Sequence, residues 1–432
     1  MTTQASPTRP PASEAAPRRG LLAPSPTRLP LPTPAEPPTV RRGPLAVAAV
    51  IGAALTAYVW ARHGAEPGVL LLLGIALGVA LFHSRFGFTS AWRQLIAVGN
   101  GVGLRAHTVL LGATATLFAI VIGTGSGLFG SVPQPSGGPL GIALVIGSFL
   151  FAVGMQLGGA CASGTLFAVG SGQTSIVLTL GGFVAGSTLA AWQFPLWSDL
   201  PAFPSVVLSD HVGWAGSWAL TVAVLAVVFL VSRRVQARRN PPPAGVAPSA
   251  RGFLARTVRG SWPLYAGAGV LAVLGALVLL VSGGAWGVTS AFALWGAKLV
   301  SALGGHPETW AYFQQPKNAA QLSGPVLADK TSLTDIGVMV GAAVAAAVGG
   351  VWRLHRSVPA RTAVAALLGG VLMGVGARLA SGCNIGAYLA GIASGSLHGW
   401  VWGAVALVGT WVGLRLRPLF GLGNPRPGDS VC

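Results

Sequence analysis

The chain has 432 residues, of which 52% are hydrophobic and only 8% are charged. Soluble proteins carry about 25% charged residues, so this composition excludes an ordinary water-soluble enzyme of this length. The net charge of +18 comes mainly from arginines in terminal and connecting segments, a distribution that indicates membrane orientation and not nucleic-acid binding.

The N-terminal segment, residues 1–43, differs from the rest of the chain. It is rich in Pro, Ser, Thr and Ala, and its arginines outnumber its acids. Such a composition cannot bury enough apolar surface to fold, so we expect a disordered basic tail on the cytoplasmic side. It has no apolar run near its start, and we therefore expect no signal peptide.

Ten later segments are apolar enough, and long enough or nearly so, to cross a bilayer as helices. The connections after even-numbered spans carry the arginines, and the 233–260 linker holds seven arginines and no acid. The opposite loops hold acids, lysines or no charge, so the positive-inside rule predicts that both termini are cytoplasmic. The predicted spans are residues 44–62, 67–84, 106–124, 138–157, 173–193, 214–232, 263–282, 334–352, 359–377 and 397–414.

Four short apolar pieces fit none of these spans and form two pairs. Residues 87–92 and 287–292 match at four of six positions at an offset of 200, and residues 157–164 and 379–386 align Leu, Cys and Gly at an offset of 222. This order predicts four re-entrant half-helices in an inverted-topology repeat, with the pieces meeting near the midplane. The alternative is that all four are surface connectors, which would have no reason to repeat.

The predicted organisation places each repeat unit after an extra span. An odd number of crossings between the units reverses the second one, as in many transporters. The segments are the tail 1–43, an extra first transmembrane helix 44–66, a first repeat unit 67–195, an outer loop with a connecting transmembrane helix 196–232, a basic cytoplasmic linker 233–260, a second repeat unit 261–416 and a cytoplasmic tail 417–432.

Two cysteines occupy equivalent places in the repeat. Cys161 and Cys383 each lie in a turn rich in small residues, before a short apolar piece. A half-helix N-terminus attracts an anion, and a thiol adds a soft, polarizable contact that suits sulfur or selenium better than phosphate. The alternative is that both are small buried hydrophobes. The candidate translocation residues are Gly159, Cys161, Ser163, Gly164, Arg378, Ser381, Cys383, Asn384 and Gly386, with Gly87, Thr89, Ser90, Thr289 and Ser290 from the first short pieces.

Arg378 lies five residues before Cys383, at the end of a span. An arginine there either draws anions to the outer mouth or extends to lipid headgroups, and the sequence favours neither. Its counterpart in the first unit is the neutral Gln156. Three tryptophans flank the first pair of short pieces and are expected to be interface anchors: Trp92, Trp286 and Trp295.

The positions of the Asp and Glu residues argue against a proton relay. Glu66 and Asp335 fall at the ends of predicted spans, and the other acids lie in tails or loops. We therefore expect no proton relay through a carboxylate at a span centre. Two thiols without partnering His or carboxylates make a poor metal site, and no nucleotide-binding loop is present, so we expect no metal and no cofactor.

Three motifs resemble those of the YeeE/YedE sulfur-transport family, bacterial inner-membrane carriers associated with thiosulfate uptake. They are residues 82–96 and the turns around Cys161 and Cys383, and residues 286–298 are similar to the longer YedE-type branch, some members of which are linked to selenium. The resemblance covers about residues 67–416. It implies a path in which three cysteines pass a small inorganic sulfur anion by S–H contacts, with Gly87 here in the third place. It also implies a small cytosolic sulfur-carrier protein as a partner.

Two functions follow as hypotheses. The first is an inner-membrane transporter for thiosulfate or a related sulfur or selenium compound, which passes a constriction lined by the cysteine turns. The second is a membrane-bound sulfurtransferase or sulfur sensor, in which Cys161 carries a persulfide; this needs an activated thiolate. A purely structural membrane protein would not need the repeated cysteine turns.

Overall fold

The computed structural model describes residues 39–239, 252–354 and 357–425, which are almost entirely helical. Ten helical segments of these residues are long and apolar enough to cross a membrane. The prediction of an all-α polytopic membrane protein with about ten transmembrane helices is confirmed. The predicted 1–43 tail lies almost wholly outside the described residues, as do positions 240–251 of the 233–260 linker and 426–432 of the last tail.

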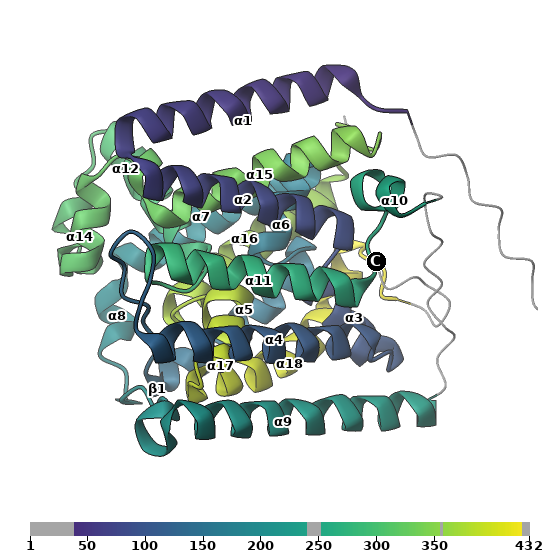
Figure 1. Ribbon diagram of the computed structural model, residues 1–432, viewed down its shortest axis with the longest axis vertical. Coiled ribbons are helices and arrows are strands. Elements are labelled where there is room, and N and C mark those ends of the chain that lie inside the picture. The colour runs from purple at the N-terminus through teal and green to yellow at the C-terminus, as the bar shows by residue number, and fades with distance from the viewer. Residues whose placement is uncertain (1–38, 240–251, 355–356, 426–432) are drawn as a thin grey trace, which may run out of the picture.

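The long helices run side by side, with α1 and α9 at opposite edges and α2, α11 and α4 between them (Figure 1). The N-terminal part contains α1 (Arg42–His63), α2 (Ala65–Ser84), α3 (Phe88–Val98), α4 (Val102–Thr124), β1 (Leu140–Gly141), α5 (Ile142–Gly158), α6 (Ala162–Gly170), α7 (Thr174–Trp192), α8 (Phe194–Ser198), β2 (Ala202–Phe203) and α9 (Ser209–Arg239). The two strands pair antiparallel, Leu140 with Phe203.

The C-terminal part repeats this order of long and short helices. It contains α10 (Phe253–Arg259), α11 (Leu264–Ser282), α12 (Thr289–Ala302), η1 (Pro307–Thr309), α13 (Ala311–Gln314), α14 (Pro316–Ser323), η2 (Val326–Ala328), α15 (Lys330–Val348), α16 (Ala360–Leu379), the π-helix η3 (Asn384–Leu389), α17 (Ala390–Ala393), α18 (Leu397–Leu416) and η4 (Arg417–Phe420).

Packing between the halves is reciprocal. Helix α2 packs against α15, and α11 packs against α4; α5 packs against α18, and α7 packs against α16. At the margins, α1 packs on α2 and α15, while α9 packs on α4. Each packed pair of helices is therefore matched by a second pair, made of the equivalent helices of the opposite halves.

Glycines allow these helices to approach closely. A Cβ on Gly369 of α16 would lie 2.7 Å from the backbone oxygen of Gly154 in α5, and one on Gly376 would lie 2.5 Å from that of Gly147. On another face of α16, a Cβ on Gly370 would overlap the backbone of Thr179 in α7. Small residues let membrane helices pack backbone to backbone, so α5, α16 and α7 form one tightly packed layer.

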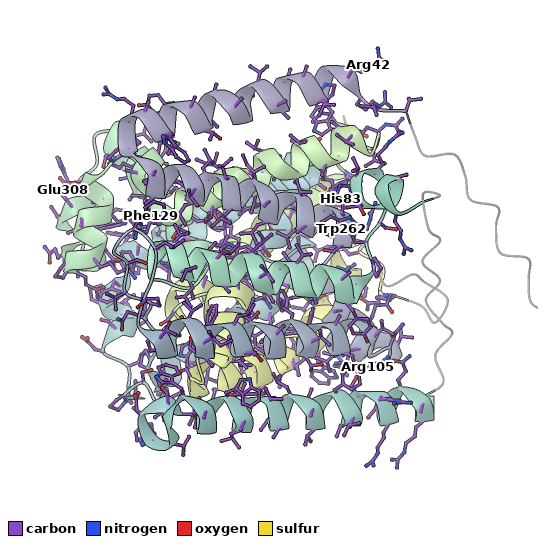
Figure 2. The ribbon with its side chains drawn as sticks, viewed as in Figure 1. Arg42, His83, Arg105, Phe129, Trp262 and Glu308 are labelled. Atoms are coloured by element: carbon purple, nitrogen blue, oxygen red, sulfur yellow. The ribbon has the colours of Figure 1, made fainter. Side chains whose placement is uncertain are left out.

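Charge separates the two ends of the helix bundle. Arg42, His83 and Arg105 lie at one end in Figure 2, and Glu308 lies at the other. At the acidic end Glu66 pairs with Lys330 at 2.8 Å. By the positive-inside rule the arginine-rich end would be cytoplasmic, which stays a prediction.

One helix begins earlier than its apolar run predicts. The predicted span starts at residue 334, but α15 starts at Lys330, because the Asp329 carboxylate caps it by accepting a bond of 2.7 Å from the Ser332 amide. Asp335 therefore lies in the second turn of the helix, fully buried, and not at a span end as expected.

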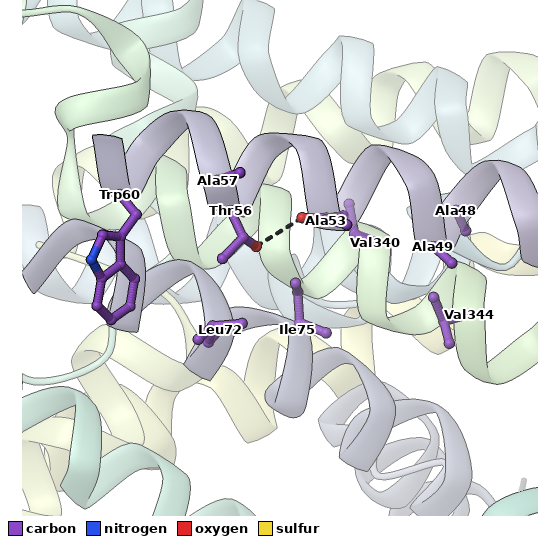
Figure 3. A pocket seen from close by; sticks show the side chains of 11 residues that line it. Ala48, Ala49, Ala53, Thr56, Ala57, Trp60, Leu72, Ile75, Val340 and Val344 are labelled. Atoms are coloured by element: carbon purple, nitrogen blue, oxygen red, sulfur yellow. Dashed lines mark hydrogen bonds between the residues drawn. The ribbon is translucent and has the colours of Figure 1, made fainter. Parts of the chain in front are cut away.

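An apolar groove of about 520 Å³ separates part of α1 from α2 and α15 (Figure 3). Its lining includes Leu72, Ile75 and Val340, with two polar side-chain groups: the Trp60 indole and the Thr56 hydroxyl, which donates to the Gly52 carbonyl at 2.7 Å. A groove without charge offers nothing to an anion, so the candidate path lies elsewhere.

Candidate functional site

The first cysteine turn links α5 to α6. Gly159 has φ +89°, a left-handed conformation that favours glycine and lets the chain reverse. Cys161 then adopts extended backbone angles, φ −79° and ψ −176°, at the N-cap of α6. Its carbonyl accepts the Thr165 amide at 2.7 Å, and its Sγ lies 3.7 Å from the Ser163 hydroxyl. The thiol is thus buried at the start of a short helix.

The second cysteine turn repeats this backbone at an offset of 222. Ser381, the counterpart of Gly159, is left-handed with φ +54°, a conformation that costs a non-glycine residue energy. Cys383 is extended, φ −111° and ψ −166°, at the N-cap of η3, and its carbonyl accepts the Ala387 amide at 2.8 Å. The first turn of the following helix is wider than an α-turn, and π-turns are frequent at functional sites.

The short pieces converge on η3. Trp92 of α3 packs edge-on against Tyr388 of η3, with ring centroids 5.5 Å apart. A Cβ on Gly386 would lie 3.8 Å from Gly287, just before α12, and η3 also contacts α6. The structure therefore brings residues from all four short pieces, which are far apart in sequence, to one region.

The tryptophan expectation is wrong for two residues. Trp92 is 1% exposed and Trp286 is 3% exposed, so both pack inside the protein and neither reaches the membrane interface. Trp295 is half-buried and donates to the Ser332 hydroxyl at 2.9 Å. Hydrophobicity alone cannot distinguish an interfacial indole from one that covers a re-entrant piece.

Arg378 is buried and directed at the first short piece of the second half. Its guanidinium donates to the Thr289 hydroxyl at 2.8 Å and to the Tyr312 hydroxyl at 2.7 Å. Both partners are neutral, and none of the described carboxylates forms an ion pair with Arg378. The interpretation that this side chain extends to headgroups is therefore wrong, and its positive charge stays inside the protein.

The first half holds a matching pair at the opposite end of the bundle. Gln156, the counterpart of Arg378, directs its amide Nε2 at the Thr89 carbonyl, 3.4 Å away, just as Arg378 bonds to Thr289. Gln156 itself is neutral, and two arginines supply the positive charge beside it. Arg93 Nε donates to the Gln156 side-chain oxygen at 2.9 Å, and Arg417 donates to the Gln156 backbone carbonyl at 2.6 Å. Positive charge therefore lies near both pairs.

Buried polar atoms without partners gather on these same segments. They include both side-chain polar atoms of Asn384, next to Cys383, and the Thr89 hydroxyl. Arg378 Nε, Arg93 Nη2 and the Trp286 indole N–H are further donors without a partner. Buried polar groups in proteins are almost always hydrogen-bonded, and all of these atoms except the Asn384 amide oxygen can donate, so the set suits a ligand that accepts hydrogen bonds.

The remaining candidates have local roles. Ser90 bonds to the Gly87 carbonyl at 3.3 Å, and Ser290 bonds to Thr331 at 3.0 Å. Gly164 sits against the Cys161 turn, because a Cβ there would lie 3.3 Å from the Cys161 sulfur. These residues therefore shape the turns, and the thiols, Asn384 and the cations remain as the candidate ligand groups.

Residues 83–412, which include both cysteine turns and all four short pieces, match the protein family described as "Sulphur transport". The chain belongs to this family. Thiosulfate transporter TsuA of Spirochaeta thermophila is 26% identical over 79% of this chain and 96% of TsuA. TsuA of Escherichia coli is 26% identical over 79% of this chain and 92% of TsuA.

Probable transporter YedE of Escherichia coli shares a shorter but more similar stretch. It is 34% identical over 142 residues, which is 32% of this chain and 34% of YedE. The match therefore spans about a third of YedE. The resemblance to the YeeE/YedE sulfur-transport proteins is confirmed at the level of the family.

Sequence reasoning missed several residues at the site of this sulphur transport protein. The Gln156–Thr89 contact could have been found, because both residues follow from the offsets of 222 and 200. Arg93 and Arg417 carried no such signal, since each looked like one more cytoplasmic arginine. His398 links the Cys383 turn to the segment before β1, with Nε2 3.0 Å from the Ala380 carbonyl and Nδ1 3.2 Å from that of Pro139.

Proposed function

We propose that this chain transports a small sulfur-containing anion, thiosulfate or a close relative, through a constriction lined by the two cysteine turns. The observation that carries the proposal is the similar backbone around Cys161 and Cys383, which buries two thiols at the starts of two short helices that contact each other. The names of the TsuA relatives, thiosulfate transporters, support the same substrate class. Helix N-termini and polarizable thiols suit a divalent anion that ends in sulfur.

Buried arginines supply positive charge at both ends of the proposed path. Arg378 stands near the outer pair and Arg93 with Arg417 near the inner pair, so an anion meets positive charge before and after the thiols. Neutral hydrogen-bond partners leave these guanidiniums free to attract it. With Gly87 in place of a third cysteine, the anion would exchange contacts between two thiols only.

An inverted repeat of re-entrant half-helices belongs to the same proposal. Units 67–195 and 261–416 would be related by an axis in the membrane plane, with 44–66 and 196–232 as the extra segments before each. The reciprocal packing of α2 with α15 and α11 with α4, and the exchange of α5–α18 for α7–α16, support such an axis.

The transport proposal is tested with purified protein in proteoliposomes. We expect uptake of radiolabelled thiosulfate above that of empty liposomes, with strong competition by unlabelled thiosulfate and weak competition by sulfate. Sulfate lacks the polarizable terminal sulfur that two thiols would recognise. Sulfite and selenite serve as further competitors. Uptake no higher than in empty liposomes for every anion would refute transport.

We further propose a bacterial inner-membrane location with cytoplasmic termini and a cytoplasmic 233–260 linker. In a Cys432→Ala background, a cysteine at exposed Arg238 should react with a membrane-impermeant maleimide only after the cells are permeabilised. A cysteine at exposed Glu308, in the opposite loop, should react in intact cells. Labelling in the reverse order would overturn this topology.

The sulfurtransferase alternative has weaker support. A reactive cysteine needs a nearby cation or base, and the Cys161 sulfur has only the Ser163 hydroxyl as its hydrogen-bond partner among the described residues. Mass spectrometry of protein incubated with thiosulfate separates the two, because a carrier turns over without a stable persulfide adduct. The cytosolic sulfur-carrier partner stays a prediction of the resemblance.

A further inference from the structure

Asp335 is a carboxyl group buried in the membrane part of the protein without a partner. It lies in the second turn of α15 and has 0% exposure. Neither carboxyl oxygen has a hydrogen-bond partner among the described residues. Nearly every other described acid lies at the ends of the bundle or in loops, where water reaches it. A buried acid of this kind needs a physical account.

The position of Asp335 faces the site and not the lipid. The preceding residue, Thr334, packs its backbone against Gly74 of α2, and Met339, one turn further, packs its backbone against Gly170 of α6. Residues four apart share a face of a helix, so Asp335 lies on the side of α15 that meets α6. Helix α6 begins at the Cys161 turn and contacts η3, which begins at the Cys383 turn, so Asp335 lies on the side of α15 toward both cysteine turns.

Charged groups of both signs lie on α15 and on the helices packed against it. Asp329, which caps α15, contributes negative charge near Asp335. No described cation bonds to either oxygen. The charged and titratable groups on the other helices packed against α15 are Arg42, Tyr58, Arg62 and His63 of α1, Glu66 and His83 of α2, Arg256 and Arg259 of α10, and Lys298 of α12, with Cys161 at the cap of α6 and Lys330 at the start of α15 itself.

A bare carboxylate in this setting is costly, because burial removes its hydration and no partner replaces it. A carboxylate would also repel a dianion bound at the adjacent thiol. Taking up a proton removes both penalties at once. The anion and the proton therefore favour each other's binding, which is what coupled transport requires.

We propose that Asp335 is the proton-binding site that couples anion uptake to protons, an inference that rests on the proposed transport function. Protonation from the outer side neutralises Asp335 and lets the anion reach Cys383. Release of the anion inward is followed by loss of the proton to the same side. The sequence led us to expect no proton relay through a carboxylate at a span centre; Asp335 lies in the second turn of α15, away from that centre, but is fully buried.

The test uses the full chain in proteoliposomes, in sodium-free buffer with the membrane potential clamped by potassium and valinomycin. One pH unit, acid outside, should raise the equilibrium accumulation of thiosulfate about tenfold for one coupled proton. Asp335→Asn, which mimics the protonated acid, should keep thiosulfate exchange across liposomes with thiosulfate on both sides. It should lose the pH-driven accumulation. Glu66→Gln, a change at a half-buried acid that pairs with Lys330 at the end of the bundle, should keep both.

The outcomes separate two failures. If the unmodified protein exchanges thiosulfate but ignores the pH gradient, or if Asp335→Asn still accumulates it, the proton inference is wrong and transport stands. If the unmodified protein exchanges no thiosulfate, the proposed function fails. Infrared spectroscopy then tests Asp335 independently of transport. The spectrum of the unmodified protein minus that of Asp335→Asn should show the band of a protonated carboxyl group. No such difference would also overturn the inference.

Discussion

Replacing Cys161 with alanine should lower thiosulfate uptake about tenfold or more, the change that a loss of about 1.4 kcal/mol of binding free energy produces. The thiol is 2% exposed, and it is the one soft group of a turn that contains no charge. Cys161→Ser should fail nearly as badly, because a hydroxyl keeps a donor of similar size but lacks the polarizable sulfur. Initial uptake rates in proteoliposomes measure the effect.

Matched cysteine changes act as controls for this result. Cys383→Ala should reduce uptake by a smaller factor, since Arg378 still attracts the anion nearby. Cys432→Ala, at a position outside the described residues, should change nothing. Each variant must first elute as a folded protein on size-exclusion chromatography, because the turn is buried. Full uptake by folded Cys161→Ala protein would mean that the cysteine only fills space.

Arg378→Gln should reduce uptake about tenfold to a hundredfold, in line with about 1.5–3 kcal/mol for a hydrogen bond to a charged group. Glutamine can still bond to Thr289 or Tyr312, so the turn keeps part of its support while the charge is lost. We expect the loss mainly as a higher KM for thiosulfate. Arg378→Lys, which keeps the charge but not the planar fork, should recover part of the uptake.

The opposite end of the same helix offers the control. Arg361 starts α16, is exposed and lies at the arginine-rich end, so Arg361→Gln should leave the KM unchanged. Tyr312→Phe removes one acceptor from Arg378 and should have a small effect. An equal loss in Arg361→Gln and Arg378→Gln would show that general surface charge, and not the buried guanidinium, attracts the anion.

Much of the fold could be predicted because the membrane imposes length and polarity on each span. The ten apolar runs became ten candidate spans, and the turns around Cys161 and Cys383 share a left-handed residue two positions before an extended cysteine at a helix start. Both features are local: a run of apolar residues, and a turn whose small residues sit at fixed places.

What could not be predicted depends on tertiary contact. Arg378 allowed two interpretations until Tyr312, 66 residues away in sequence, was found to hold it inside. Trp92 is buried because Tyr388 and Trp402 pack on it, and no window around residue 92 contains either ring. Helix α15 begins with polar residues directly after its cap, Asp329. A hydropathy count excludes those residues, so the predicted span started at 334 and Asp335 fell at its end.

The glycine contacts of α16 limit how this protein can work. Helices α5, α16 and α7 touch through their backbones, where even one methyl group would clash, so they cannot slide or roll past one another without separating. Rocking of one half against the other, the usual way a carrier exposes its site to alternate sides, would have to break this layer. We expect instead a fixed frame in which only the short turns and their side chains move, so that an anion crosses by small local openings.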